Sequence, residues 1–176
     1  DNGQDDAGLT TLFDQPGLLD GAYGLLPNDR THQIKAYGSY QITEQFNLGA
    51  NLSWQSGRPV NAFGYHPTDV FAREYGSESF YKAGVLAPRG SEGRTDSVLS
   101  IDLSASYTMP LGESEVTFRA DVFNVLNSDT VTEVDEIHDL DGQDYDAANV
   151  QVNPNFGLAS NWQSPRYVRL SASYRF

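Results

Sequence analysis

Five stretches of the chain alternate apolar and polar residues with a period of two, and each runs for roughly ten residues or more. They span approximately residues 31–43, 46–57, 96–109, 115–127 and 166–176. Such alternation predicts strands with one apolar and one polar face. Strands of soluble proteins average roughly five to six residues, whereas a tilted strand needs about ten to cross a bilayer. The length of these runs therefore favours an all-β, antiparallel transmembrane barrel over a soluble β-sandwich, which stays the alternative.

The connections between the predicted strands are of two kinds. Residues 44–45 and 110–113 form short links, whereas residues 58–95 and 128–165 form long polar loops rich in Gly, Pro, Asp and Asn. Short turns on one side and long loops on the other are the usual layout of outer-membrane barrels. If the C-terminal residue is periplasmic, we expect both long loops and the preceding segment 1–30 to be extracellular.

Aromatic residues of the predicted apolar face gather at the short-turn ends of the strands. These residues are Tyr40, Phe46, Tyr107, Phe118, Tyr174 and Phe176. Amphipathic rings are best placed between lipid headgroups and hydrocarbon, so this distribution predicts an aromatic girdle at one membrane interface. Trp54 is expected at the opposite interface. In a soluble β-sandwich, aromatic residues are not expected to gather at one end of the strands.

Composition and charge narrow the class of protein further. No apolar run approaches the roughly 18 residues of a spanning helix, so a membrane role needs strands. The chain contains no cysteine, which excludes disulfides and cysteine metal ligands. A net charge of -13 argues against nucleic acid as a partner. Acidic residues concentrate in the loops, where we expect them to be solvated, and the missing N-terminal signal predicts a piece of a longer polypeptide.

Two C-terminal stretches resemble a known family. The sequence of residues 119–127, RADVFNVLN, resembles the penultimate-strand motif of TonB-dependent outer-membrane receptors. Residues 168–176 resemble their terminal strand, in which Tyr174 and Phe176 match the assembly signal of outer-membrane barrels. Residues 26–33 are similar to the Oar-like branch of this family, whose members carry a carboxypeptidase-regulatory-like domain.

The resemblance implies that this chain is about the last five strands of a plugged barrel of about 22 strands in a Gram-negative outer membrane. Five strands cannot close such a barrel, and open edges in lipid would leave backbone groups unpaired. The implied partners are the remaining strands and plug, the TonB-type energy-coupling complex, outer-membrane lipid and the barrel assembly machinery. The implied function is energy-coupled import of a scarce ligand. A surface receptor or scaffold for a protein partner and a passive porin are the alternatives.

No arrangement of residues predicts an enzyme, because the three histidines are dispersed and no serine has a His-Asp pair to activate it. The loop 58–95 combines cationic and aromatic residues that could stack on or hydrogen-bond a ligand. The candidates are Arg58, Tyr65, His66, Tyr75, Phe80 and Tyr81. The alternative is that these side chains pack the loop on itself or on its neighbours.

One further stretch raises the question of a metal. Asp139, Asp141 and Asp144 space their oxygens as in a calcium loop, and Gly142 would allow the sharp turn. The full twelve-residue EF-hand pattern is missing, which favours the alternative of a solvated acidic loop. No other cofactor is expected.

Overall fold

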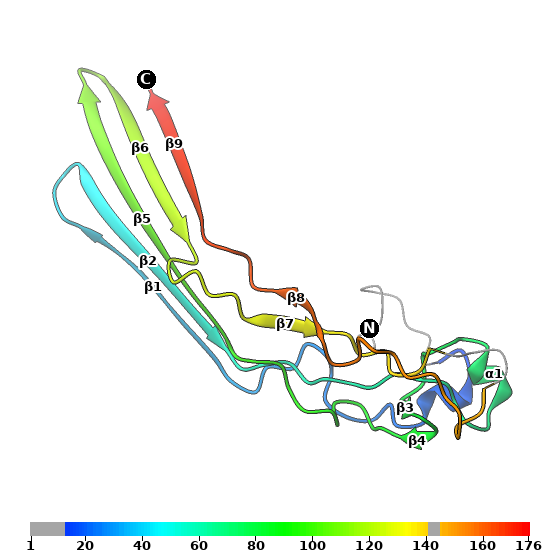
Figure 1. Ribbon diagram of the computed structural model, residues 1–176. Helices are drawn as coiled ribbons and strands as arrows, with labels where there is room; N and C mark the ends of the chain where they lie inside the picture. The colour runs from blue at the N-terminus through cyan, green and yellow to red at the C-terminus, as the bar shows by residue number, and fades with distance from the viewer. Residues whose placement is uncertain (1–12, 141–144) are drawn as a thin grey trace. The chain divides into compact units, whose positions relative to one another are not determined.

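The computed structural model describes residues 13–140 and 145–176, which separate into two compact units (Figure 1). The sheet unit consists of residues 31–56, 97–130 and 162–176. The loop unit consists, among the described residues, of 13–30, 57–96, 131–140 and 145–161. Each unit brings together segments that are far apart in the sequence.

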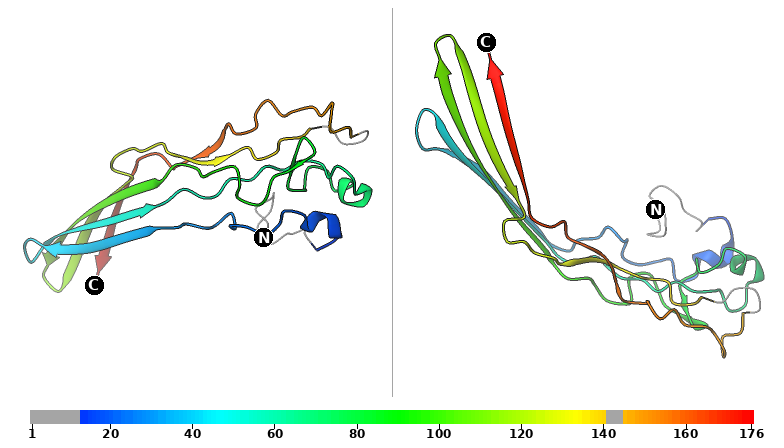
Figure 2. Two further views of the ribbon diagram at one scale, coloured as in Figure 1. Left: turned by 90° about the horizontal axis from the view of Figure 1, so that it is seen from below. Right: turned by 45° about the horizontal axis from the view of Figure 1, so that its top comes forward.

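Five strands form the sheet unit, and every neighbouring pair is antiparallel. In spatial order they are β1 (Gln33–Gln41), β2 (Phe46–Gln55), β5 (Val98–Leu111), β6 (Ser114–Phe123) and β9 (Tyr167–Arg175). The two hairpin turns and the C-terminus lie at the same end of this sheet, as Figure 2 shows from two directions. The predicted all-β, antiparallel class is confirmed. The sheet is open, with β1 and β9 at its margins, so barrel closure and the total number of strands stay predictions.

The strand register places the apolar residues on one face. Leu103 of β5 lies opposite Ala50 of β2 and Val122 of β6, and Val122 lies opposite Val168 of β9. Because directly opposed residues of antiparallel strands share a face, this row continues the apolar surface across four strands. The residues between them along each strand, such as Ser104, point to the other face.

Local side-chain and backbone chemistry closes the two hairpins. The Thr43 hydroxyl accepts hydrogen bonds from the backbone N–H groups of Gln45 (3.3 Å) and Phe46 (3.0 Å), which fixes the turn after β1. The second turn is shorter than the sequence predicts, because β5 continues through Leu111. Only two residues remain in it, and the first, Gly112, has the positive φ of 68° that a type II′ hairpin requires.

In the described part of the loop unit, the helices and strands are all short. They are η1 (Pro16–Leu19), α1 (Val70–Arg73), β3 (Tyr81–Lys82) paired with β4 (Val85–Leu86), and β7 (Val131–Val134) paired with β8, which spans Ala159–Trp162. Phe63 and Phe80 pack in its centre with ring centroids 5.1 Å apart. Across the part of the chain that the structure describes, no helix has the length and apolar character to cross a membrane.

Buried polar groups hold the loop unit together alongside this small apolar core. Glu136 and Asp139 are both buried, so the expectation that the acidic loop residues are solvated is wrong for these two. The physical reason is that irregular backbone has few ladder partners, and its buried N–H groups need side-chain acceptors instead. Glu136, for example, accepts from the backbone N–H of Asn61 (3.0 Å) and from its side-chain amide (3.3 Å).

Candidate functional site

The polar face of the sheet carries a group of three charged residues. Arg119 and Asp121 belong to β6, and Arg169 belongs to β9. Asp121, whose side chain is 5% exposed, accepts from Nε of Arg119 at 2.8 Å and from Nη2 of Arg169 at 3.0 Å. The Arg169 guanidinium also lies over the Phe123 ring, 5.2 Å from its centroid. These residues border a groove of about 640 Å³. The two guanidiniums, which are themselves 50% and 61% exposed, compensate in part for the loss of water around the Asp121 carboxylate.

The FNVLN stretch ends β6 with a second polar network. Asn124 adopts a left-handed conformation (φ 48°), which asparagine tolerates better than most residues. Its side-chain amide donates to the carbonyls of Ser128 and Ser164, both at 2.8 Å, and its side-chain oxygen accepts from Ser128 N–H at 3.0 Å. Its backbone N–H donates to Asp102 of β5 at 3.0 Å. Asn124 therefore ties the end of β6 to β5 and to the segment before β9, a role that the sequence motif alone does not reveal.

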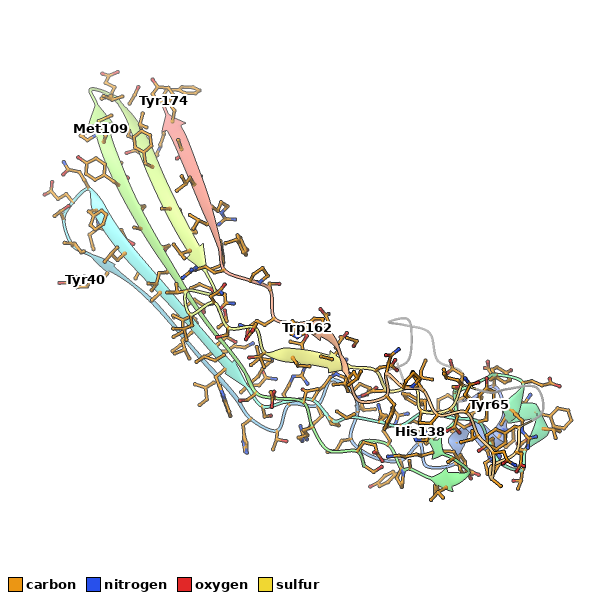
Figure 3. All side chains as sticks on the ribbon, in the orientation of Figure 1. Tyr40, Tyr65, Met109, His138, Trp162 and Tyr174 are labelled. Carbon is orange, nitrogen blue, oxygen red and sulfur yellow. The ribbon has the colours of Figure 1, made fainter. Side chains whose placement is uncertain are left out.

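Aromatic residues line one end of the apolar face. Phe46, Tyr107 and Phe118 are successive cross-strand neighbours on β2, β5 and β6. Figure 3 shows Tyr40, Met109 and Tyr174 at the same, turn-bearing end of the sheet.

The two residues of the expected assembly signal lie beyond this row. The Tyr174 hydroxyl bonds Ser114 Oγ at 3.0 Å, whereas Phe176 is 97% exposed.

In the loop unit, two of the predicted ligand-binding residues, His66 and Tyr81, contact Asp20 of the N-terminal segment. His66 is buried, and its Nε2 lies 3.1 Å from Asp20 Oδ2, which also accepts from the Tyr81 hydroxyl at 3.3 Å. The His66 Nδ1 accepts backbone N–H groups of Thr68 and Asp69, so the proton resides on Nε2. Burial and the negative charge of Asp20 raise the pKa of Tyr81, which keeps its hydroxyl a donor.

The other predicted ligand-binding residues fall into two groups. Phe80 is fully buried, and Arg58 is bound by Glu136 at 2.7 Å with its own side chain 12% exposed. Tyr65 is partly buried and stacks on Tyr145 with centroids 5.7 Å apart, whereas Tyr75 is exposed. The structure thus brings Arg58 and Phe80 into the interior, while Tyr65, Tyr75 and Tyr81 remain accessible in part. Ligand binding by this loop stays a prediction.

Asp139 is fully buried at a junction of three loop segments. Its carboxylate accepts from the backbone N–H groups of Tyr65 (3.4 Å) and Ala83 (3.1 Å) and pairs with His138 Nδ1. The bond to Ala83 fixes the β3–β4 hairpin, whose Ala83 has a positive φ of 48°. Asp139 therefore serves as a buried hydrogen-bond acceptor for backbone N–H groups.

The calcium prediction rests on residues that are only in part described. Asp141 and Asp144 lie outside the described residues. Across 13–140 and 145–176, no three His, Cys, Asp or Glu side chains are grouped to hold a metal ion. The buried position of Asp139 leaves less of its carboxylate for a cation than the sequence suggests, and calcium binding stays a prediction.

The fold and its surfaces define an all-β chain whose main antiparallel sheet is apolar on one face and polar and charged on the other. A comparison with known proteins adds a relative: the chain is 31% identical, over a 209-residue alignment that covers all of it, to the TonB-dependent transporter Oar of Myxococcus xanthus. This supports a relationship to TonB-dependent receptors. The chain spans 19% of the length of that relative. No protein-family model and no solved structure matches the chain.

Proposed function

We propose that this chain forms about the last five strands of a TonB-dependent transporter in a Gram-negative outer membrane. The observation that carries the proposal is the sheet itself, whose continuous apolar face is solvent-exposed while the opposite face holds buried charge. On the apolar face, Leu103 is 45% exposed and Leu170 is 77% exposed. Exposed apolar area of this extent needs a cover, and a bilayer provides one that matches strands of this length.

The two margins of the sheet point to the same environment. Among the strands that the structure describes, β1 and β9 have one neighbour each, so each presents one unpaired row of N–H and C=O groups along nine residues. In hydrocarbon each unsatisfied group costs several kcal/mol, so the margins must pair with further strands. The natural source of those strands is the rest of the same polypeptide, which would close around a plug.

The function that follows is energy-coupled import. The polar face, with Arg119, Asp121 and Arg169, would face the lumen and plug. The loop unit would face the exterior and meet the ligand, with Tyr65, Tyr75 and Tyr81 as its accessible aromatic residues. Tyr174 and Phe176 would be read by the barrel assembly machinery. The TonB-type complex would act on the part of the protein that precedes this chain.

The compact loop unit favours a second candidate, a surface receptor or scaffold for a protein partner. Its buried network orders segments that a channel alone would not need to order, and an ordered, rigid surface suits protein recognition. A passive porin has no such specific observation in its favour.

Spin labels on β5 test the membrane part of the proposal. The chain has no cysteine, so single cysteines can be introduced at each position of 99–105 in the whole protein, freed of any other cysteine. In lipid vesicles, oxygen accessibility should peak at Leu99, Ile101, Leu103 and Ala105, and a water-soluble nickel reagent should favour the positions between them. Accessibility without this alternation would reject a lipid-facing sheet.

Growth assays separate transport from the alternatives. A strain that lacks the whole protein and a strain that lacks its TonB-type partner should share a defect on the same limiting nutrient. A porin would show the defect only in the first strain. A receptor would lose binding of its protein partner without a nutrient defect.

A further inference from the structure

Three of the arginines of the loop unit lie close together. Residues 58–59 and 94–95 run antiparallel, with Pro59 paired with Arg94 and with Thr95 N–H donating to the Arg58 carbonyl at 2.9 Å. Arg94 donates from Nη1 to the Gly57 carbonyl at 2.7 Å and from Nη2 to the carboxylate of Asp29. The ion pair with Asp29 brings the adjacent Arg30 to the same place. This arginine cluster, Arg30, Arg58 and Arg94, stands out in a chain of net charge -13.

The carboxylates in contact with the cluster do not balance it. Glu136 pairs with Arg58 at 2.7 Å, and Asp29 pairs with Arg94. In the described part of the chain, the Arg30 guanidinium makes its hydrogen bond to the Asp29 carbonyl, at 3.3 Å. Burial, then repulsion from Arg58 and Arg94, lower the pKa of Arg30, and Asp29 opposes them. Among residues 13–140 and 145–176, three cations thus face two anions, and no carboxylate forms an ion pair with the Arg30 guanidinium.

We propose that Arg30, supported by Arg58 and Arg94, binds a phosphate group. A guanidinium presents paired N–H donors that match two phosphate oxygens, and the positive charge that Glu136 and Asp29 leave unbalanced in the cluster adds to the attraction. Arg58 is 12% exposed and fixed by Glu136, so it supplies positive potential rather than contact. The Arg94 side chain is 29% exposed and lies close enough to Arg30 to add positive potential there.

The position of the cluster along the sequence indicates where such a phosphate comes from. Each arginine of the cluster lies within four residues of a strand end. Arg30 precedes the start of β1, Arg58 follows the end of β2, and Arg94 precedes the start of β5. If the proposed outer-membrane location holds, these strand ends lie at the external membrane surface, where lipid headgroups carry phosphate. The second source is a phosphate-bearing solute. Both sources offer phosphate oxygens to the Arg30 guanidinium, and only the lipid source rests on the proposed function.

Titration of the whole protein in non-ionic detergent tests the site. Inorganic phosphate at low ionic strength should bind, and Arg30→Gln should weaken binding roughly fivefold, the usual effect of one cation at an anionic surface. Lys82→Gln is the matched control, because it removes one positive charge from the same unit at a residue paired with Glu92, 2.9 Å away. The control should bind phosphate as the unmodified protein does. Added salt should weaken binding, because it screens charge.

A second arm replaces phosphate with mixed micelles that contain phosphatidylglycerol or phosphatidylcholine. Preference for phosphatidylglycerol that Arg30→Gln abolishes assigns the site to lipid, whereas phosphate binding without that preference assigns it to a solute. Equal binding by Arg30→Gln and the unmodified protein, or equal weakening by Lys82→Gln, overturns the proposal. If Arg30→Gln fails to fold, Arg30→Lys carries the test, because it keeps the charge and should still lose affinity with the paired donors. The phosphate arm needs no membrane, so it can succeed where the outer-membrane proposal fails.

Discussion

Leu103→Arg is the substitution that most directly tests the lipid-facing surface. Leu103 lies near the middle of β5, between Ala50 and Val122, on the apolar face. At the midplane of a bilayer, arginine on the lipid face of a barrel costs about 2–4 kcal/mol. If water instead covered this half-exposed position, the same change would cost less than about 1 kcal/mol. We therefore expect Leu103→Arg to destabilise the whole protein by about 3 kcal/mol in lipid vesicles.

Two matched variants show whether the cost of arginine at Leu103 depends on the face of the sheet and on depth in the bilayer. Ser104→Arg places the same side chain one residue later on the polar face, opposite Asp121, and should cost less than about 1 kcal/mol. Met109→Arg keeps the apolar face but lies toward the turn, opposite Val116, where the depth dependence predicts about 0–1 kcal/mol.

The assay is urea unfolding of the whole protein in vesicles, with the folded fraction read from the heat-dependent shift of the band on a gel. Leu103→Arg that costs no more than Ser104→Arg would refute a lipid-facing surface. Equal large costs at Leu103 and Met109 would indicate that a protein layer, rather than a bilayer, covers the face.

Three further predictions concern the polar contacts made by Asp139 and Asn124. Gly64→Ala would place a methyl group 2.4 Å from Asp139 Oδ2 and 2.5 Å from the Tyr81 carbonyl. The free energy of unfolding should therefore fall by about 1–3 kcal/mol, and hydrogen exchange in the loop unit should rise. Ala83→Gly removes a methyl group at positive φ and should cause neither change. Asn124→Ala should cost about 2–3 kcal/mol in urea unfolding, and a loss below about 0.5 kcal/mol would contradict its role as a tie between strands. Burial, and next the charge of Asp139, raise the pKa of Tyr145 from 10.0 to about 12. The unfolded chain ionises first, so stability should be complete below pH 10 and should fall between pH 10 and about pH 12. Ultraviolet titration should show this late step, and Tyr145→Phe should remove it.

The sequence by itself determined the sheet. Period-two alternation fixes which residues share a face, and a slip of one residue would turn every apolar side chain to the polar side. For this reason the predicted runs and the observed strands coincide closely, as for 46–57 and β2 at Phe46–Gln55. Residue type also restricted the turns, although the exact end of β5 depended on the pairing of Leu111 with Ser114.

Only the tertiary structure shows which residues of the loop unit contact one another. Its contacts join Asp20 to His66, Arg58 to Glu136 and Asp139 to Ala83, across separations of 46, 78 and 56 residues. No local periodicity encodes such pairs, since each depends on where irregular backbone brings an N–H group or a cation. The sequence predicts Arg58, His66 and Phe80 as ligand-binding residues, and only the fold shows that their side chains lie largely inside the unit. Arg30 is the one cationic residue in segment 1–30, and only the ion pair between Asp29 and Arg94 shows that it lies in a cluster of arginines.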